Sequence, residues 1–106
     1  MSEQPAVSDS FEAFTQQAAG FSGPFMEMVE RLAAASALDP KTRELAYLAV
    51  LAALRMESGL GFHVMLAKRH GASREEVTSA LLVGLPAAGL AVVSGLPAAL
   101  AAYDAA

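Results

Sequence analysis

The chain has 106 residues, of which 55% are apolar and 17% charged, with a formal net charge of −4 at pH 7 and no cysteine. This length suits a single domain, and the lack of cysteine excludes disulfides, thiolate chemistry and cysteine-ligated zinc. The seven lysines and arginines are scattered between Arg31 and Arg74 and form no patch, so nucleic acid is not an expected partner.

The first segment, residues 1–22, is predicted to be an N-terminal arm or a short helix. Its opening residues are polar, whereas Phe11 and Phe14 share one helical face, which favours a helix over 9–19 that stops at Gly20. We expect the two phenylalanines to anchor this arm, which otherwise has too little apolar content to fold alone. The start of the chain has no apolar signal-peptide core, and we expect a cytoplasmic protein.

Residues 23–106 are predicted to form the main domain. Gly23-Pro24 predicts a helix start, because proline at the first helical position has a suitable φ and lacks only a hydrogen that would be unbonded there. Four apolar residues then recur at the spacing of one helix face: Phe25, Met28, Val29 and Leu32.

A central buried helix is predicted from Pro40 to about Met56. Asp39 is a favourable N-cap, and Pro40 follows it at the first helical position. Beyond Glu44 the segment is apolar on every side, as expected of a helix inside the core. Two glycines in the segment 58–61 then interrupt the pattern, since glycine is costly in a helix interior.

Two further helices follow the interruption. One covers about 60–70 and ends in basic residues before Gly71, which suits the negative end of the helix dipole. The next begins at Ser73, because Ser73 and Glu76 have the spacing of a capping box.

The last segment, from Val77 to Tyr103, contains no charged side chain and exceeds the ~20 residues of a membrane-spanning helix. Pro86 and Pro97, together with three glycines, divide it, and alanine rather than leucine dominates its composition. We therefore expect helices buried in an oligomer and no membrane partner. The fold class is predicted to be all-α, a compact bundle of five to seven helices around the 40–56 helix.

The segment from Leu54 to His70 resembles the redox motif of the alkyl hydroperoxidase D and carboxymuconolactone decarboxylase family, which has the form Cys-x-x-Cys-x-x-x-His. Met56 and Gly59 stand at the two cysteine positions, and His63 stands at the histidine position. The phrases at 38–45 and 71–77 are similar to the family's in the same order. The chain is identified as a member that lacks the redox cysteine pair, with the compact helical fold of the alkyl hydroperoxidase D type.

The resemblance implies a site in which Glu44 matches a proton-relay glutamate and His63 its histidine. Peroxide reduction needs a thiolate and a second, resolving thiol, which Met56 and Gly59 do not provide. The decarboxylase branch of the family uses no cofactor and no redox cysteine. By resemblance, Glu44 and His63 are therefore the candidate catalytic residues. An anionic substrate would need a counter-charge, and Arg43 and Arg55 are the nearest in sequence. The candidate substrate-binding residues are Arg55, Met56 and Gly59.

Three functions remain open at this stage. The first is a cofactor-free lyase, decarboxylase or isomerase that acts on a small carboxylated metabolite by Glu/His acid–base chemistry. The second is an inactive family member that binds a small apolar ligand or a partner protein, and the third is a residual alkyl hydroperoxidase activity. No metal is expected, because His63 and His70 are separated by ~10 Å of helix rise.

The expected partner is the chain itself, in a homotrimer or homohexamer. Family members of this size usually assemble in this way, and the apolar content exceeds what a monomer of this length hides easily. Glu44 and His63 are expected to meet at a pocket beside Met56 and Gly59. Restored cysteines should recover peroxidase activity only in part, since a glycine such as Gly59 can hold backbone angles that cysteine resists.

Overall fold

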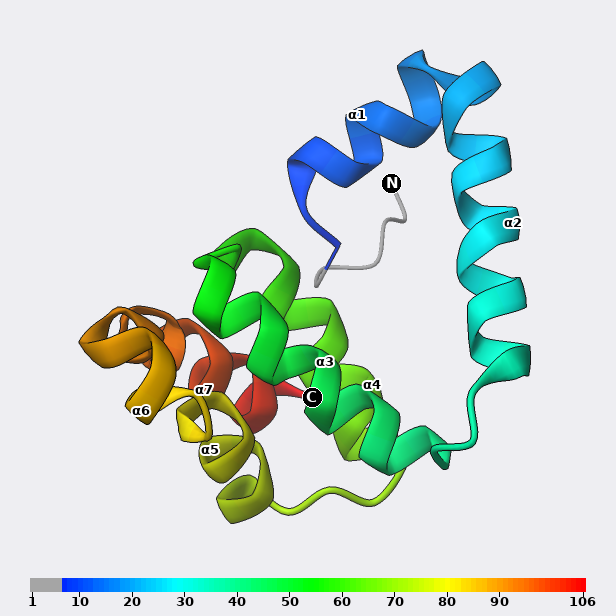
Figure 1. The fold of residues 1–106 in the computed structure, drawn as a ribbon. Coiled ribbons are helices and arrows are strands. Elements are labelled where there is room, and N and C mark those ends of the chain that lie inside the picture. The colour runs from blue at the N-terminus through cyan, green and yellow to red at the C-terminus, as the bar shows by residue number, and fades with distance from the viewer. Residues whose placement is uncertain (1–6) are drawn as a thin grey trace.

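The structure, a computed structural model, describes residues 7–106, whose regular elements are all helices, with no strand among them (Figure 1). The elements in chain order are α1 (Asp9–Gln17), α2 (Ala19–Ala35), α3 (Pro40–Leu54), the 3₁₀ turn η1 (Glu57–Gly59), α4 (Leu60–Arg69), α5 (Arg74–Leu82), α6 (Leu85–Ala88), the 3₁₀ segment η2 (Gly89–Gly95) and α7 (Leu96–Ala105). The all-α prediction is confirmed. The first six residues of the predicted arm lie outside the described residues, and the oligomeric state stays a prediction.

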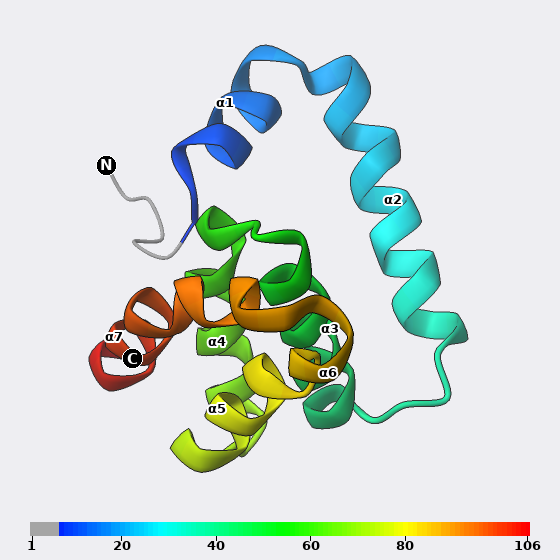
Figure 2. The ribbon, with the colours of Figure 1, turned by 60° about the vertical axis from the view of Figure 1, so that its left-hand side comes forward.

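Helices α3 to α7 form the core, with α3 at its centre (Figure 2). Helix α3 packs against α4 and α5, and α7 closes the other side of α4. Helix α3 thus packs as a central helix, but the prediction that it is buried on every side is wrong. Leu48, Leu51 and Ala52 are buried, whereas the side that carries Tyr47, Val50 and Leu54 is exposed, because none of the helices α4 to α7 covers it. The largest fully buried side chains come from α3, α4, α5 and η2: Leu48, Leu60, Val64, Val77, Leu81 and Val92.

Helix α3 begins and ends close to the predicted residues. The Asp39 side chain accepts a hydrogen bond from the backbone of Thr42 at 3.0 Å, and hydrogen bonding from Thr42 lowers the pKa of Asp39. The helix ends at Leu54 because Arg55 adopts the left-handed conformation with φ 59°. The amide of Arg55 then bonds to Ala52 and that of Met56 to Leu51, the paired bonds of a Schellman motif.

Helix α2 departs from the sequence prediction. It begins at Ala19 rather than at Gly23-Pro24, because the chain turns at Ala18 with φ −137° and ψ 48°. Gly20, the predicted stop, and Pro24, the predicted first residue, both lie inside α2. Proline there removes the bond to the Gly20 carbonyl. That loss is tolerated since nothing lies within 4 Å of a Cβ built on Gly20, which leaves this side open to solvent.

Helices α1 and α2 form a hairpin that stands away from the core (Figure 1). Phe11, Phe14 and Phe25 pack together between them, with the Phe14 and Phe25 ring centroids 5.6 Å apart in an edge-to-face arrangement. The predicted anchors Phe11 and Phe14 thus fasten α1 to α2. Ser22 is the one buried residue of α2, so most of this helix is exposed.

The long apolar segment at the end of the chain is divided as predicted. By length and composition Arg74–Ala105 could cross a membrane, with a mean hydropathy of 1.9. The structure breaks it into α5, α6, η2 and α7, with Pro86 and Pro97 in the first turns of α6 and α7. Helix α5 begins with the predicted capping box, in which Ser73 and Glu76 bond reciprocally.

Candidate active site

Helices α3 and α4 bring Glu44 and His63 into contact. Glu44 Oε1 and His63 Nδ1 are 2.8 Å apart, and 13% and 26% of their side chains are exposed. Glu44 lies in the second turn of α3, whose start is capped by Asp39. His63 lies in the first turn of α4, which follows the turn η1 at Gly59 and has no side-chain cap. The predicted proximity of the two residues is confirmed, while their catalytic role stays a prediction.

The contact sets the tautomer of His63. An ionised carboxylate can only accept hydrogen bonds, so Nδ1 carries the hydrogen that Glu44 accepts. In the neutral ring Nε2 is then an unprotonated acceptor. No hydrogen bond joins Nε2 to another group of residues 7–106. A carboxylate that orients an imidazole in this way leaves Nε2 able to take up or deliver a proton.

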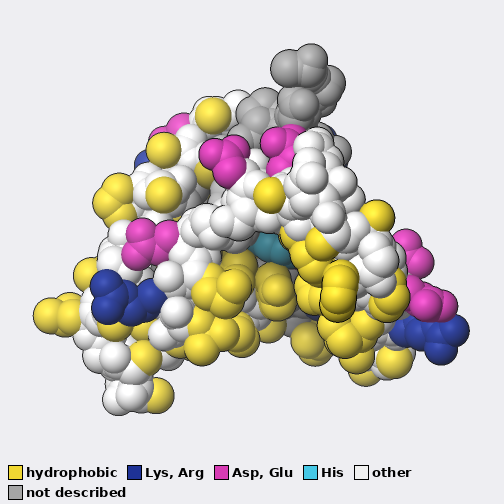
Figure 3. All heavy atoms as spheres, turned by 90° about the horizontal axis from the view of Figure 1, so that it is seen from above, with side chains coloured by type: hydrophobic (Ala, Val, Ile, Leu, Met, Phe, Trp, Pro, Cys, Tyr) yellow, Lys and Arg dark blue, Asp and Glu magenta, His cyan; other side chains and the backbone are white. Residues whose placement is uncertain are grey.

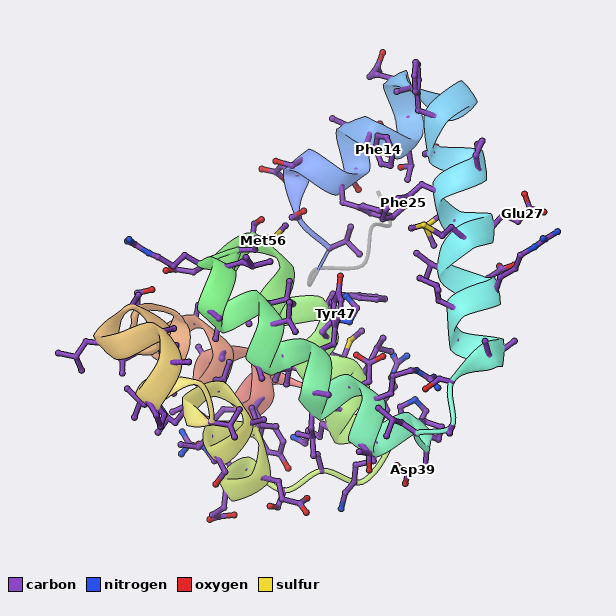
Figure 4. The ribbon with its side chains drawn as sticks, viewed as in Figure 1. Phe14, Phe25, Glu27, Asp39, Tyr47 and Met56 are labelled. Carbon is purple, nitrogen blue, oxygen red and sulfur yellow. The ribbon has the colours of Figure 1, made fainter. Side chains whose placement is uncertain are left out.

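Two aromatic rings flank the imidazole. The Tyr47 centroid lies 4.6 Å from that of His63, with the ring planes at 60°, and Phe62 lies edge-on at 5.3 Å and 88°. Together with Glu44 these rings restrict the imidazole on several sides. Tyr47 is 46% exposed and stands on the side of α3 that faces α2 (Figure 4).

Sequence reasoning did not assign Tyr47 or Phe62 to the site. The available signal was spacing, since Tyr47 follows Glu44 by three residues and therefore lies on the same helix face. Phe62 directly precedes His63, and adjacent residues of a helix do not normally face each other. The contact between their rings could therefore not be predicted from spacing.

The site is open on the surface. A hollow between hydrophobic walls contains a histidine side chain in its floor (Figure 3). Two other depressions, one along α2 and one beside α5, are not lined by Glu44 or His63. A pocket that joins the Glu44–His63 pair to Met56 and Gly59 stays a prediction.

The three predicted substrate-binding residues lie in the turn between α3 and α4. Arg55 and Met56 are both exposed, Met56 to 51%, and Figure 4 places Met56 at the end of α3 remote from Asp39. Neither forms a hydrogen bond or an ion pair with Glu44 or His63 among the described residues. Their part in substrate binding stays a prediction.

Gly59 corrects one expectation. Its backbone is right-handed, with φ −88° and ψ −11°, and a Cβ built there meets the Leu51 methyl groups at 3.6 Å, an ordinary contact. The expectation that a glycine at this position resists cysteine is therefore wrong for Gly59. A side chain at this position would therefore point toward Leu51 of α3.

The described part of the chain contains no cluster of metal-binding side chains. Within residues 7–106 no group of three or more histidine, aspartate or glutamate side chains is arranged to hold an ion. The chain also has no cysteine, so a dithiol cycle has neither of its two thiols. An acid–base role for the Glu44–His63 pair stays a prediction.

Comparison with known families gives one match. The profile of the Carboxymuconolactone decarboxylase family matches residues 20–106, and the chain belongs to that family. The match includes both members of the Glu44–His63 pair and the turn between them. No curated protein and no solved structure matches the chain.

Proposed function

We propose that the chain is an enzyme without a cofactor that acts on a small carboxylated metabolite through Glu44 and His63. It is either a lyase of the decarboxylase type or an isomerase. The observation that carries the proposal is the 2.8 Å contact between Glu44 Oε1 and His63 Nδ1, which leaves Nε2 without a partner among residues 7–106. Family membership supports the same class of chemistry. A positioned acid–base group of this kind contributes about 10²–10⁴-fold to a rate.

In a decarboxylation, the carbon–carbon bond to the carboxylate breaks and its electron pair moves into an adjacent conjugated system as CO2 leaves. A proton must then be added to carbon. The protonated imidazole delivers it from Nε2, and the ring recovers a proton from water. The carboxylate of Glu44 stabilises the charged ring through Nδ1 during the cycle. In an isomerisation, Nε2 first removes a proton from carbon and then returns it elsewhere.

An anionic substrate needs a counter-charge and a wall. In this proposal Arg55 supplies the charge, and Met56 and Gly59 border the substrate at the turn between α3 and α4. Backbone N–H groups at the start of α4 add a second source of positive potential. Tyr47 acts as a positioning residue, because its ring lies against the imidazole and limits its rotation.

The test uses carboxymuconolactone, the substrate class named by the family, as the probe. Incubation in D2O buffer, followed by NMR, reports both loss of CO2 and the deuteron added to carbon. We expect turnover by the unmodified chain and a loss of about 10²–10⁴-fold in His63→Gln. The matched control is His70→Gln, which removes the exposed second histidine at the end of α4. The proposal is wrong if the chain neither releases CO2 nor exchanges a carbon-bound proton for deuterium, or if His63→Gln is as active as the control.

A second candidate is an inactive family member that binds a small apolar ligand. The observation that favours it is the aromatic surround of His63, since Tyr47 and Phe62 present ring faces and edges rather than charges. Binding of a small aromatic probe that shifts the His63 and Tyr47 NMR signals, without any turnover, would favour this candidate. The same shifts with turnover would favour the lyase.

We also propose that the chain assembles with itself, as a homotrimer or homohexamer. Several large apolar side chains outside the core are exposed in a single chain, among them Val83 to 67% and Leu90 to 76%. Exposed apolar surface on this scale marks an interaction site. Light scattering that reports a stable monomer at micromolar concentration would contradict it.

A further inference from the structure

Helix α2 has an apolar face that its own chain covers only in part, at Phe25, where Phe11 and Phe14 pack. Its apolar residues have the spacing of one helix face, and such a face is normally buried against another element. In this structure they are exposed: Phe25 to 39%, Met28 to 47%, Val29 to 39% and Leu32 to 61%. We call these four residues the arm face. The extensive contacts of α2 are with α1, not with the core.

A second uncovered face lies on α3, next to the candidate active site. Tyr47, Val50 and Leu54 share one side of α3 and are exposed to 46%, 50% and 62%. We call them the core face. Tyr47 also contacts the imidazole of His63, so this face continues directly into the site. Figure 4 shows Phe25 on the side of α2 that faces the core, and Glu27 on the opposite side.

We propose that the arm face of one copy docks on the core face of a second copy, and that the exchange is reciprocal, so that each copy's arm closes the Glu44–His63 site of the other. The site is then incomplete in a single chain. This inference concerns an interface and holds whether or not the site is catalytic. Of the two assemblies proposed above, it fits the homohexamer, which three reciprocal pairs can form, and not the homotrimer.

Charge favours this partner over contact between two arms. Helices α1 and α2 carry four acidic side chains and one basic one, whereas residues 39–55 carry three basic and two acidic ones. Two arms side by side would therefore bring like charge together. An arm against α3 brings opposite net charges together, which favours this pairing.

The available area requires the exchange to be reciprocal. A fully exposed large apolar side chain offers roughly 150–200 Å². At the printed exposures, the arm face and the core face of one copy together offer on the order of 600 Å². One arm face docked on one core face would bury about 600 Å², counted over both surfaces. A reciprocal pair has two such contacts and buries about 1,200 Å². A stable interface needs at least the larger value.

Docking would change the surroundings of the site. Tyr47 and His63 are partly exposed in a single chain, and an apolar helix laid across them would remove water from the hollow. Electrostatic interactions between Glu44 and the imidazole are stronger in a water-poor surround. The arm of the second copy would also form the missing wall of the substrate site.

The chain contains no cysteine, so single cysteines can be placed without background. Two full-length variants, Leu32→Cys and Val50→Cys, are co-expressed with different tags and treated with a short bis-maleimide. We expect cross-linked pairs that carry both tags. The matched control replaces Leu32→Cys by Ala34→Cys, which lies on the opposite, exposed side of α2, and should give at least tenfold fewer such pairs. Equal yields with Leu32→Cys and with Ala34→Cys overturn the proposal. A third sample carries Leu32→Cys and Val50→Cys in one chain, and cross-links that form only within that chain also overturn it.

Association and site closure are measured on a second pair of variants. Leu32→Glu places a carboxylate in the apolar interface and should weaken association at least 100-fold by sedimentation, whereas Ala34→Glu should change it less than threefold. Both side chains are exposed in the single chain, so circular dichroism should report the same helix content. Reaction of His63 with diethyl pyrocarbonate should become at least tenfold faster in Leu32→Glu, with His70 as the internal reference. A monomeric unmodified chain, or an unchanged His63 rate on dissociation, refutes the inference.

Discussion

The carboxylate of Glu44 and the imidazole of His63 meet at 2.8 Å, although the two residues belong to different helices and lie 19 positions apart in the sequence. This contact predicts which ring nitrogen carries the hydrogen in the neutral state. Because Glu44 accepts from Nδ1, we expect the Nδ1–H tautomer to predominate. In Glu44→Ala the acceptor is lost, and the ring should move toward the Nε2–H form that imidazole prefers in water.

The ¹⁵N chemical shifts of the His63 ring measure this directly and need no substrate. Glu44→Gln is the informative intermediate, because its amide oxygen can still accept from Nδ1 while the charge is gone. We expect it to keep the tautomer and to lose activity, since only the charged carboxylate stabilises the imidazolium. An unchanged ring spectrum in Glu44→Ala would contradict the assigned hydrogen bond.

The sequence predicted the elements whose signals are local. Asp39-Pro40 and the Ser73–Glu76 capping box start helices where expected, because the bonding partners lie within four residues of each other. The predicted start of α2 at Gly23-Pro24 was wrong, because Pro24 is tolerated inside a helix whose Gly20 side is open to solvent.

The site could be predicted only in part. The contact between Glu44 and His63 was expected from family resemblance, because no spacing rule tells which faces of two separate helices meet. Spacing places Tyr47 on the same face of α3 as Glu44. Its contact with His63 could not be predicted, because that contact is fixed by the packing of α3 on α4. The uncovered face of α2 could not be foreseen either. Its apolar periodicity predicts that the face is buried but does not say whether the same chain or another copy supplies the covering surface.

Arg55 occupies a backbone position that favours glycine. It is the one non-glycine residue with positive φ among residues 7–106, and it ends α3 in a Schellman motif. We expect Arg55→Gly to raise the free energy of unfolding by about 1 kcal/mol, measured by urea denaturation. Ala53→Gly, inside the same helix, should lower it by a similar amount. If Arg55 binds an anionic substrate, the more stable variant should also show a higher KM.

Gly95 is required for close packing rather than for its backbone angles. A Cβ built there would come within 2.5 Å of the Leu60 side chain, which is fully buried at the start of α4. Gly95→Ala should therefore destabilise the fold by about 1–3 kcal/mol. Gly84→Ala is the matched control, because its Cβ would meet Val92 at an ordinary 3.8 Å. Equal thermal midpoints for the two variants would show that Leu60 moves aside freely.

Acid should destabilise the fold in part through the capping box of α5. The hydrogen bond from the Ser73 backbone, followed by that from Lys41, lowers the pKa of Glu76 below its usual 4.5. A carboxyl whose pKa is lower in the folded chain stabilises it above the usual value, and this contribution is lost as the pH falls through the folded value. Urea midpoints measured from about pH 6 down to about pH 2 should therefore fall less steeply in Glu76→Gln. Glu75→Gln removes the same charge without touching Ser73 or Lys41, and its profile should match that of the unmodified chain.

The unmodified chain should lack dithiol peroxidase activity, and cysteines at Met56 and Gly59 should install some. The amide of Gly59 donates to the carbonyl of Met56 at 3.1 Å, a turn that brings the two Cα atoms within about 7 Å, close to the span of a disulfide. Gly59 has right-handed angles and room for a side chain. Turnover of an organic hydroperoxide with a dithiol reductant is therefore expected in Met56→Cys/Gly59→Cys, and not in Met56→Cys alone, which has no resolving thiol. Adding His63→Gln to the double variant should lower the rate if the histidine assists the thiol. A thiol-enzyme rate in the unmodified chain would overturn the inference that this site works without redox chemistry.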